Sequence, residues 1–428
     1  MRRGDGAPEF PEQLAAEWRA RQAWVLSQQL RVAAVPAPTG QEQQRAALVH
    51  ELLRTALPQT DAGTVTHDAA GNVVLSIAPT FPAATRAPSL VCMAHLDTVF
   101  DAAVSHDPEV EGSVVRCPGI GDNGRGLAAL LVLAHTFSQS DVRARLVRPL
   151  HLVATVGEEG EGNLRGARAW FDAAESAGAR PAMALAIDGP GDESIVHHGV
   201  GSSRLKVVLR GAGGHSWLHA GAPNPLVALS RLVARAEALS EPLTRRVVVT
   251  AARMQGGEGL TSVPREAWVD FDVRSTDAAR LAATRRVLVQ LAHGVAQEAS
   301  DAGVHSAAAR GLDVQIVALG ERPAGALDVA HPLVQRAVQI TEFLGRAPRS
   351  GMASTDANVP LARGIPAIAL GAGGRGGGAH TREEWYDDHD ASVGLERVLR
   401  VVWEVGTSTA NPHDSDNLIP HSARLFRW

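Results

Sequence analysis

Four short apolar runs, each followed by acidic residues or a histidine, constrain the fold of this chain most strongly. The runs are Leu90–Ala94, Leu150–Val156, Ala182–Ile187 and Ile365–Leu370. Their length and unbroken apolar character are typical of strands that are buried on both faces of a sheet. Helical patterns separate the runs, which favours an α/β fold with a mixed sheet between helices.

The helical patterns are amphipathic or apolar stretches that end at prolines, glycines or polar residues. They cover Gln13–Val35, Glu42–Leu57, Leu127–Phe137, Leu164–Phe171, His331–Phe343 and Leu395–Val405. We therefore expect residues 1–200 and 322–406 to form one catalytic domain, followed by a C-terminal tail at 407–428.

The pattern changes between these two segments. Residues 201–321 predict the order strand, helix, strand, strand, helix, strand, with the segments Leu205–Arg210, Pro225–Leu239, Arg246–Met254, Ala267–Arg274, Asp277–Ser300 and Val314–Leu319. This order is typical of a four-stranded sheet with two helices on one face. The sequence thus predicts an inserted four-stranded α+β domain at 201–321.

Charge and composition narrow the class of protein. The formal net charge of −5, with acids and bases interspersed, offers no basic stripe for nucleic acid. No apolar run approaches the ~20 residues that a membrane span needs, and Met1–Phe10 lacks the apolar core of a signal peptide. We therefore predict a cytoplasmic protein with no nucleic-acid or membrane partner. A lone pair of cysteines, Cys92 and Cys117, is predicted to stay reduced. Two cysteines without metal-site spacing are too few for a thiolate metal site.

Acids and histidines follow the predicted strands, at the edge where open α/β sheets bind ligands. The residues concerned are His95 and Asp97, the pair Glu158 and Glu159, Asp188, His380, and Asp122 in the glycine-rich stretch Gly119–Gly124. Imidazoles and carboxylates together form a ligand set that suits zinc, cobalt or manganese. The pattern predicts a metal site.

Each cluster alone also has a purely structural interpretation. His95 and Asp97 are compatible with a loop hydrogen bond, the two glutamates with a solvated turn, and Asp122 with a helix cap. Their joint position favours the metal site, because carboxylates gathered at buried strand ends repel one another and lose hydration unless a cation is present.

The motifs together resemble those of a family, the co-catalytic zinc peptidases that include peptidase T, glutamate carboxypeptidase, acetylornithine deacetylase and succinyl-diaminopimelate desuccinylase. The resemblance rests on Ala94–Val99, Gly119–Gly124, Gly157–Gly160, Asp188, Gly214–Ser216, Thr355–Asn358 and Ala379–Thr381. It implies a zinc-exopeptidase-like catalytic domain with the inserted lid, and two divalent metal ions, most simply zinc, with cobalt or manganese as alternatives.

The resemblance also implies a role for each residue of these motifs. The metal ligands are His95 and Asp188 for one ion, Glu159 and His380 for the other, and Asp122 between them. The catalytic residues are Glu158 as acid and base, Asp97 orienting His95, and His215 at the oxyanion of the substrate. Arg274 and Asn358 are the expected substrate-binding residues.

The resemblance leaves several activities open. Asp188 and the stretch Gly157–Ala167 favour a metal-dependent exopeptidase of the aminopeptidase or di- and tripeptidase type. The alternatives are an N-acyl amino acid deacylase or carboxypeptidase of the same family, or a non-catalytic binding relative. The expected partners are a short peptide or N-acyl amino acid as substrate, and a second copy of the chain in a homodimer formed through the lid.

Overall fold

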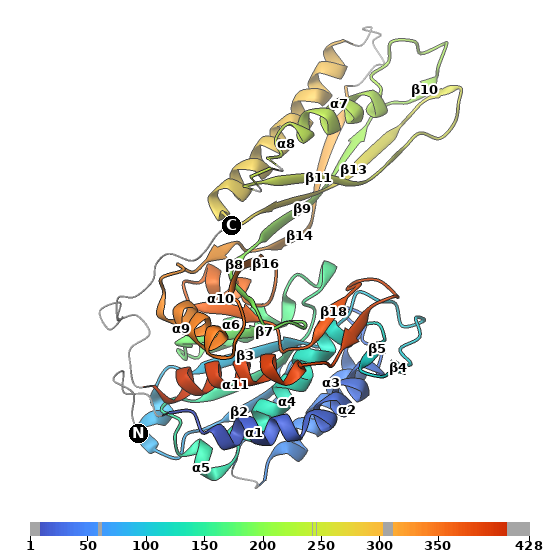
Figure 1. The fold of residues 1–428 in the computed structure, drawn as a ribbon. Helices are drawn as coiled ribbons and strands as arrows, with labels where there is room; N and C mark the ends of the chain where they lie inside the picture. The colour runs from blue at the N-terminus through green and yellow to red at the C-terminus, as the bar shows by residue number, and fades with distance from the viewer. Residues whose placement is uncertain (1–8, 59–61, 242, 245, 303–310, 409–428) are drawn as a thin grey trace. The chain divides into compact units, whose positions relative to one another are not determined.

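The computed structural model describes residues 9–58, 62–241, 243–244, 246–302 and 311–408. The chain divides into two compact units, a first unit up to Gly199 and from Ala326 onward, and a second unit, Val200–Gly325. The predicted fold class is confirmed: the first unit has a mixed sheet between helices and the second a four-stranded sheet with helices (Figure 1). Of the predicted tail, Thr407 is the last residue of a helix and 409–428 lie outside the described residues.

The large sheet of the first unit has the strand order β1-β2-β6-β3-β7-β17-β8-β15, with β16 beside β8. The strands are β1 Thr64–His67, β2 Val73–Ile77, β3 Leu90–His95, β6 Leu150–Thr155, β7 Met183–Ile187, β8 Ser194–Gly199, β15 Gly325–Ala326, β16 Arg349–Ala353 and β17 Ala367–Leu370. The four apolar runs form β3, β6, β7 and β17, as predicted. These strands pair in parallel with one another, which explains why their sequences are continuously apolar.

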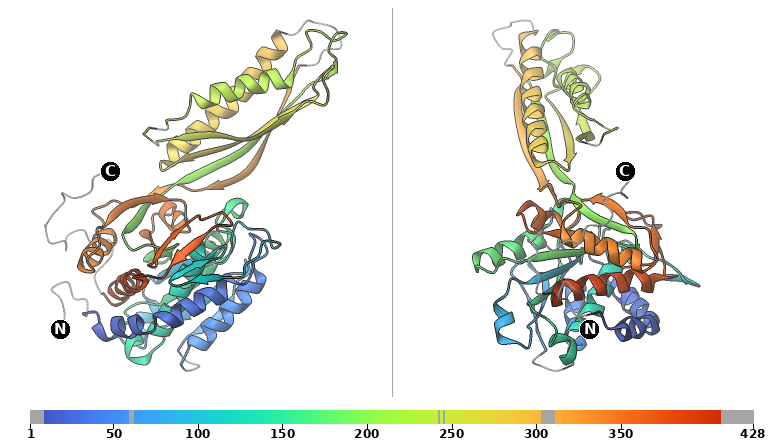
Figure 2. Two further views of the ribbon diagram at one scale, coloured as in Figure 1. Left: turned by 45° about the vertical axis from the view of Figure 1, so that its right-hand side comes forward. Right: turned by 60° about the vertical axis from the view of Figure 1, so that its left-hand side comes forward.

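Helices cover both faces of this sheet, as the two views of Figure 2 show. They are α1 Glu12–Ala20, α2 Gln22–Ala33, α3 Gln43–Ala56, α4 Gly126–Phe137, α5 Ser140–Arg143, α6 Arg165–Ser176, α9 Pro332–Phe343, α10 Asn358–Ala362 and α11 Ala391–Thr407. Alternate residues of β3 belong to different cores: Cys92 packs in the core that contains α4, and Met93 in the core that contains α6. The sheet therefore lies between two apolar layers.

The predicted helix Gln13–Val35 is two helices, with the break at Arg21. Arg21 leaves the helical conformation with φ −98° and ψ 16°. Its guanidinium carbon lies 4.4 Å from the ring centroid of Trp18 and 5.1 Å from that of Trp24. This cation–π contact with one ring from each helix stabilises the bend, which helical periodicity alone does not reveal.

The second unit contains the six predicted strands and helices in the predicted order, together with two short strands, Gly214–His215 and Ser262–Val263, that were not predicted. It contains β9 Gly201–Arg210, β10 Gly214–His215, α7 Pro225–Glu237, β11 Val248–Gly256, β12 Ser262–Val263, β13 Glu266–Ser275, α8 Ala278–Asp301 and β14 Asp313–Arg322. Its main sheet has the order β11-β13-β9-β14, and a small ladder joins β10 to β12. Asn224 and Asp277 cap α7 and α8 by accepting backbone N–H groups of their first turns.

A smaller sheet in the first unit joins segments that are far apart in the sequence. Its order is β18 (Arg375–Gly377), β19 (Trp385–Asp387), β5 (Val114–Arg116) and β4 (Glu109–Glu111). Because β5 precedes Asp122 and β19 follows His380, this sheet brings the flanks of two predicted ligands together.

The structure also bears on the predictions about the cysteines and about membrane spans. Cys92 and Cys117 are both free and buried, as predicted. Among the helices that the structure describes, none combines the length and apolar character of a membrane span.

Candidate metal centre

The predicted metal ligands gather at one edge of the large sheet. His95 is the last residue of β3, Glu159 lies just after β6, and Asp188 directly follows β7. β3 lies between β6 and β7 and is parallel to both, so the three strands present their carboxyl ends at the same edge. The buried strands therefore fix the backbone positions from which these three side chains project.

Asp122 contacts both histidines through different oxygens. Its Oδ1 lies 2.9 Å from Nε2 of His95, and its Oδ2 lies 3.2 Å from Nε2 of His380. His95 Nε2 also lies 3.8 Å from Oδ1 of Asp188, and His380 Nε2 lies 2.8 Å from Oε1 of Glu159. The five predicted ligands thus form two halves, with Asp122 shared between them.

The charges of this group shift the pKa values of its members. Burial alone lowers the pKa of His95, but the neighbouring carboxylates of Asp122 and Asp188 raise it well above its usual value. Hydrogen bonds with Asp122 and Glu159 raise the pKa of His380 to about 10. Asp122 is buried, yet its bonds with His380 and His95 hold its pKa well below the usual range. The raised pKa values favour protonated imidazoles at His95 and His380. Their positive charge then compensates the carboxylates, as the charge of a bound metal ion would.

The donor set fits a pair of divalent cations. Ligand atoms of His95, Asp122 and Glu159 all lie within 4.8 Å of one another, and among the described residues no other group of three such side chains does so. Burial raises the pKa of Asp188, which reflects the cost of placing another acid in this group. Mixed nitrogen and oxygen donors suit zinc, cobalt or manganese, and their positive charge would offset that cost.

Asp97 acts on both sides of the site. Its backbone carbonyl lies 3.0 Å from Nδ1 of His95 and accepts a hydrogen bond from the Nδ1–H group, which directs Nε2 toward Asp122. Its carboxylate accepts the backbone N–H groups of Glu158 and Glu159, both at 2.9 Å, and the hydroxyl of Thr39. The side chain that was predicted to orient His95 therefore mainly holds the glutamate pair.

Three predicted residues lie outside this group of contacts. Asn358 is fully buried, and its Oδ1 accepts the backbone N–H of Thr355 within the turn before α10. His215 and Arg274 belong to the second unit, where His215 is exposed on β10 and Arg274 pairs with Asp272 at 2.8 Å.

Two buried acids of this region were not predicted. Glu384 accepts N–H groups of the loop that carries Asp122. Asp356 accepts the hydroxyl of Thr155, and its pKa is raised to about 6 by burial. The sequence could have indicated Glu384 only as a carboxylate within a few residues of the predicted ligand His380. Its neighbour Glu383 carries the same signal and is exposed.

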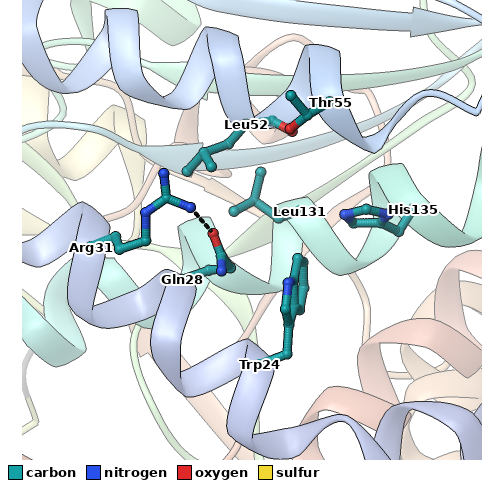
Figure 3. Close-up of a pocket in the computed structure, with 7 residues that line it drawn as sticks. All are labelled: Trp24, Gln28, Arg31, Leu52, Thr55, Leu131 and His135. Atoms are coloured by element: carbon teal, nitrogen blue, oxygen red, sulfur yellow. Dashed lines mark hydrogen bonds between the residues drawn. The ribbon is translucent and has the colours of Figure 1, made fainter.

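A cavity of about 170 Å³ lies elsewhere, between α2, α3 and α4 (Figure 3). Trp24, Leu52 and Leu131 form its apolar walls, and burial lowers the pKa of His135 at its side to about 4. None of the predicted site residues lines it. The candidate centre is therefore the strand edge.

Comparisons with known proteins place the chain among metal-dependent hydrolases. The model of peptidase family M20/M25/M40 matches residues 91–404. A tripeptidase from Staphylococcus aureus is similar at 19% identity and TM-score 0.73, with 90% of this chain and 98% of that chain covered. An aminopeptidase from Bacillus cereus is similar at 18% identity and TM-score 0.70, with the same coverage of 90% and 98%.

A dinuclear metal-binding peptidase from Bacillus subtilis is similar at 14% identity and TM-score 0.65, with 91% of this chain and 99% of that chain covered. At these identities the solved structures show the shared fold. A comparison with curated protein sequences found no match.

Metal binding should release protons. Near neutral pH both imidazoles are protonated, since acids raise their pKa values, so filling the site should release about two protons per chain. Metal affinity should fall as the pH falls, because protons compete for the imidazoles. The proton released from His380 should disappear as the pH passes about 10.

Calorimetric titration in buffers of different ionisation enthalpy measures this release. His380→Asn should lower it to about one proton, because only His95 then loses one. Heats that do not depend on the buffer near neutral pH would contradict the assignment of both histidines.

Proposed function

The chain belongs to peptidase family M20/M25/M40, and we propose that it is an exopeptidase that cleaves short peptides with the help of two divalent metal ions. Membership makes it an enzyme that hydrolyses C–N bonds. The observation that carries the proposal is the shared carboxylate of Asp122, with one histidine on each of its oxygens.

In this proposal His95 and Asp188 hold one ion, Glu159 and His380 hold the other, and Asp122 serves both. Two such ions polarise a carbonyl and lower the pKa of water by their positive charge. The chain's contribution is to fix the ligands before substrate arrives, through the parallel strands and the hydrogen bonds of Asp97.

Glu158 is the proposed general base. It is buried, and its backbone N–H is bound to Oδ1 of Asp97, one residue before the proposed ligand Glu159. A carboxylate in this position would take the proton of the attacking water and pass it to the leaving nitrogen. Zinc hydrolases commonly divide two adjacent roles, ligand and base, between separate side chains.

Residues of the second unit would contact substrate. Nδ1 of His215 accepts the backbone N–H of Trp217 at 3.2 Å, so the proton of a neutral ring lies on Nε2. That N–H is a suitable donor to an oxyanion, which supports the proposed role of His215. Arg274 would exchange its bond with Asp272 for a substrate carboxylate.

The preference for short free peptides is supported by the printed names of the similar structures, a tripeptidase and an aminopeptidase. The test is a panel of di- and tripeptides, the same peptides acetylated at the amino terminus, and N-acyl amino acids, each incubated with the metal-loaded chain. We expect cleavage of the free peptides. Cleavage of N-acyl amino acids alone would instead identify a deacylase.

We also propose that the chain forms a homodimer through the second unit. Trp217 and Leu218 are 83% and 75% exposed there, and most of the edge strand β11 is exposed as well. Exposed apolar side chains and open strand edges favour association. Analytical ultracentrifugation tests this: a monomer at micromolar concentration would contradict it.

Glu158 and Glu159 should have separable roles. Glu158→Gln keeps the shape of the side chain but loses its basicity, so we expect both metal ions to remain while kcat falls by ~10²-fold to 10⁴-fold. Glu159→Gln should lose metal first, because an amide is a poorer ligand than a carboxylate.

Elemental analysis of each dialysed variant, with steady-state kinetics at saturating metal, measures both effects. The assignment is reversed if Glu158→Gln releases metal while Glu159→Gln keeps it and only slows turnover.

A further inference from the structure

Glu384 has an unusual set of hydrogen bonds for a residue outside the proposed ligands. Its side chain is only 2% exposed. Oε2 accepts the backbone N–H of Gly119 at 2.6 Å, and Oε1 accepts those of Gly121 and Asp122, both at 2.9 Å. One buried carboxylate therefore binds three N–H groups of the loop that carries the shared ligand.

The loop is shaped to receive this carboxylate. Gly119 adopts the left-handed conformation, with φ 76°, which glycine reaches without steric cost. A Cβ atom at Gly121 would lie 3.2 Å from Oε1 of Glu384, closer than ordinary van der Waals contact. Glycine at these positions lets the backbone close around an anion, as backbone N–H groups do in anion-binding turns.

Glu384 also belongs to the segment that carries His380. The backbone N–H of Glu384 binds the carbonyl of Thr381, and that of Thr381 binds the carbonyl of Gly378, so the segment is a compact turn. The carbonyl of Glu384 accepts the N–H of Cys117 at 3.1 Å, beside the ladder of β19 and β5. The residue thus lies where the His380 segment meets the Asp122 loop.

These contacts are worth more than ordinary hydrogen bonds. Bonds from N–H groups to a carboxylate are charge-assisted and about twice as strong as those between neutral groups. Removing the charge would leave buried N–H groups without a full acceptor, which costs free energy for each such group. The cost would fall on the loop, because Glu384 itself is held by backbone bonds on both sides.

We propose that Glu384 is a positioning residue that fixes the Asp122 loop against the His380 segment, so that the two oxygens of Asp122 face the two halves of the metal centre. This inference rests on the proposed function, in which Asp122 serves both ions. Asp97 does the same for the glutamate pair, by binding the N–H groups of Glu158 and Glu159. The Asp122 loop and the glutamate pair are thus each held by a buried carboxylate.

The test is the metal affinity of Glu384→Gln. A glutamine has one acceptor oxygen, so its NH2 group must face at least one of the three N–H donors, whichever way it turns. We expect the affinity for the more weakly bound of the two metal ions to fall by ~10-fold to 100-fold. This is the loss typical of removing a partner that orients a ligand. Glu384→Asp, which keeps the charge, should recover part of the affinity.

The measurement is calorimetric titration of the full-length chain with Co²⁺, together with the visible absorption spectrum of the Co²⁺-loaded protein and the melting temperature of the metal-free protein. Two controls separate position from charge loss. Glu383→Gln removes the exposed neighbouring acid, and Glu396→Gln removes a buried acid that pairs with Arg400 on α11. Both should bind two ions with wild-type affinity and spectrum.

The outcomes distinguish the two proposals. Wild-type affinity and an unchanged Co²⁺ spectrum in Glu384→Gln would overturn the positioning role, even if the melting temperature fell, because the residue would then serve stability alone. A wild-type chain that does not bind two ions would overturn the proposed function and this inference with it. Reduced affinity in Glu384→Gln, with both controls unchanged, supports the inference.

Discussion

The shared carboxylate of Asp122 is the interaction on which the rest of the site depends. His95 reaches one oxygen from the end of a buried strand, and His380 reaches the other from a loop late in the chain. The His95 segment also reaches the other half directly, because Asp97 binds the backbone N–H groups of Glu158 and Glu159, and Asp122 adds a contact with both histidines. Binding of two ions at this place would therefore require the loop that carries Asp122, before α4, to keep one conformation. The hydrogen bonds between this loop and Glu384 have that effect.

Several buried charged groups of this region hold backbone groups in place. Glu384 and Asp97 bind N–H groups of the ligand segments, and Arg45, fully buried, donates to the carbonyls of Ala33, Val35 and Leu96. Burial lowers the pKa of Arg45 to about 10, so the guanidinium stays charged at neutral pH beneath the acids. Charged groups that are satisfied by backbone have little freedom to rearrange, which keeps the centre ready for metal.

The sequence predicts the central strands of the sheet, and the polar residues that follow them, for one physical reason, whereas the ligand roles come from the family resemblance. Strands buried on both faces must be apolar throughout, so β3 and β7 stand out, and the polar residues at their ends are conspicuous. β8 was missed because its sequence, with two adjacent histidines, is not an unbroken apolar run like those of β3 and β7. Glu384 was missed because only a contact across the fold distinguishes it from the exposed Glu383. The division of labour within Asp97, carbonyl toward His95 and carboxylate toward the glutamates, also depends on loop geometry that no local pattern records.

The central claim is that one carboxylate serves two metal ions. Anomalous diffraction from crystals grown with zinc, collected on both sides of the zinc absorption edge, tests it most directly. We expect two anomalous-difference peaks ~3.5–4 Å apart, one beside His95 and Asp188 and the other beside Glu159 and His380, with Asp122 between them. A single fully occupied peak, or a pair in which Asp122 contacts only one ion, would contradict it.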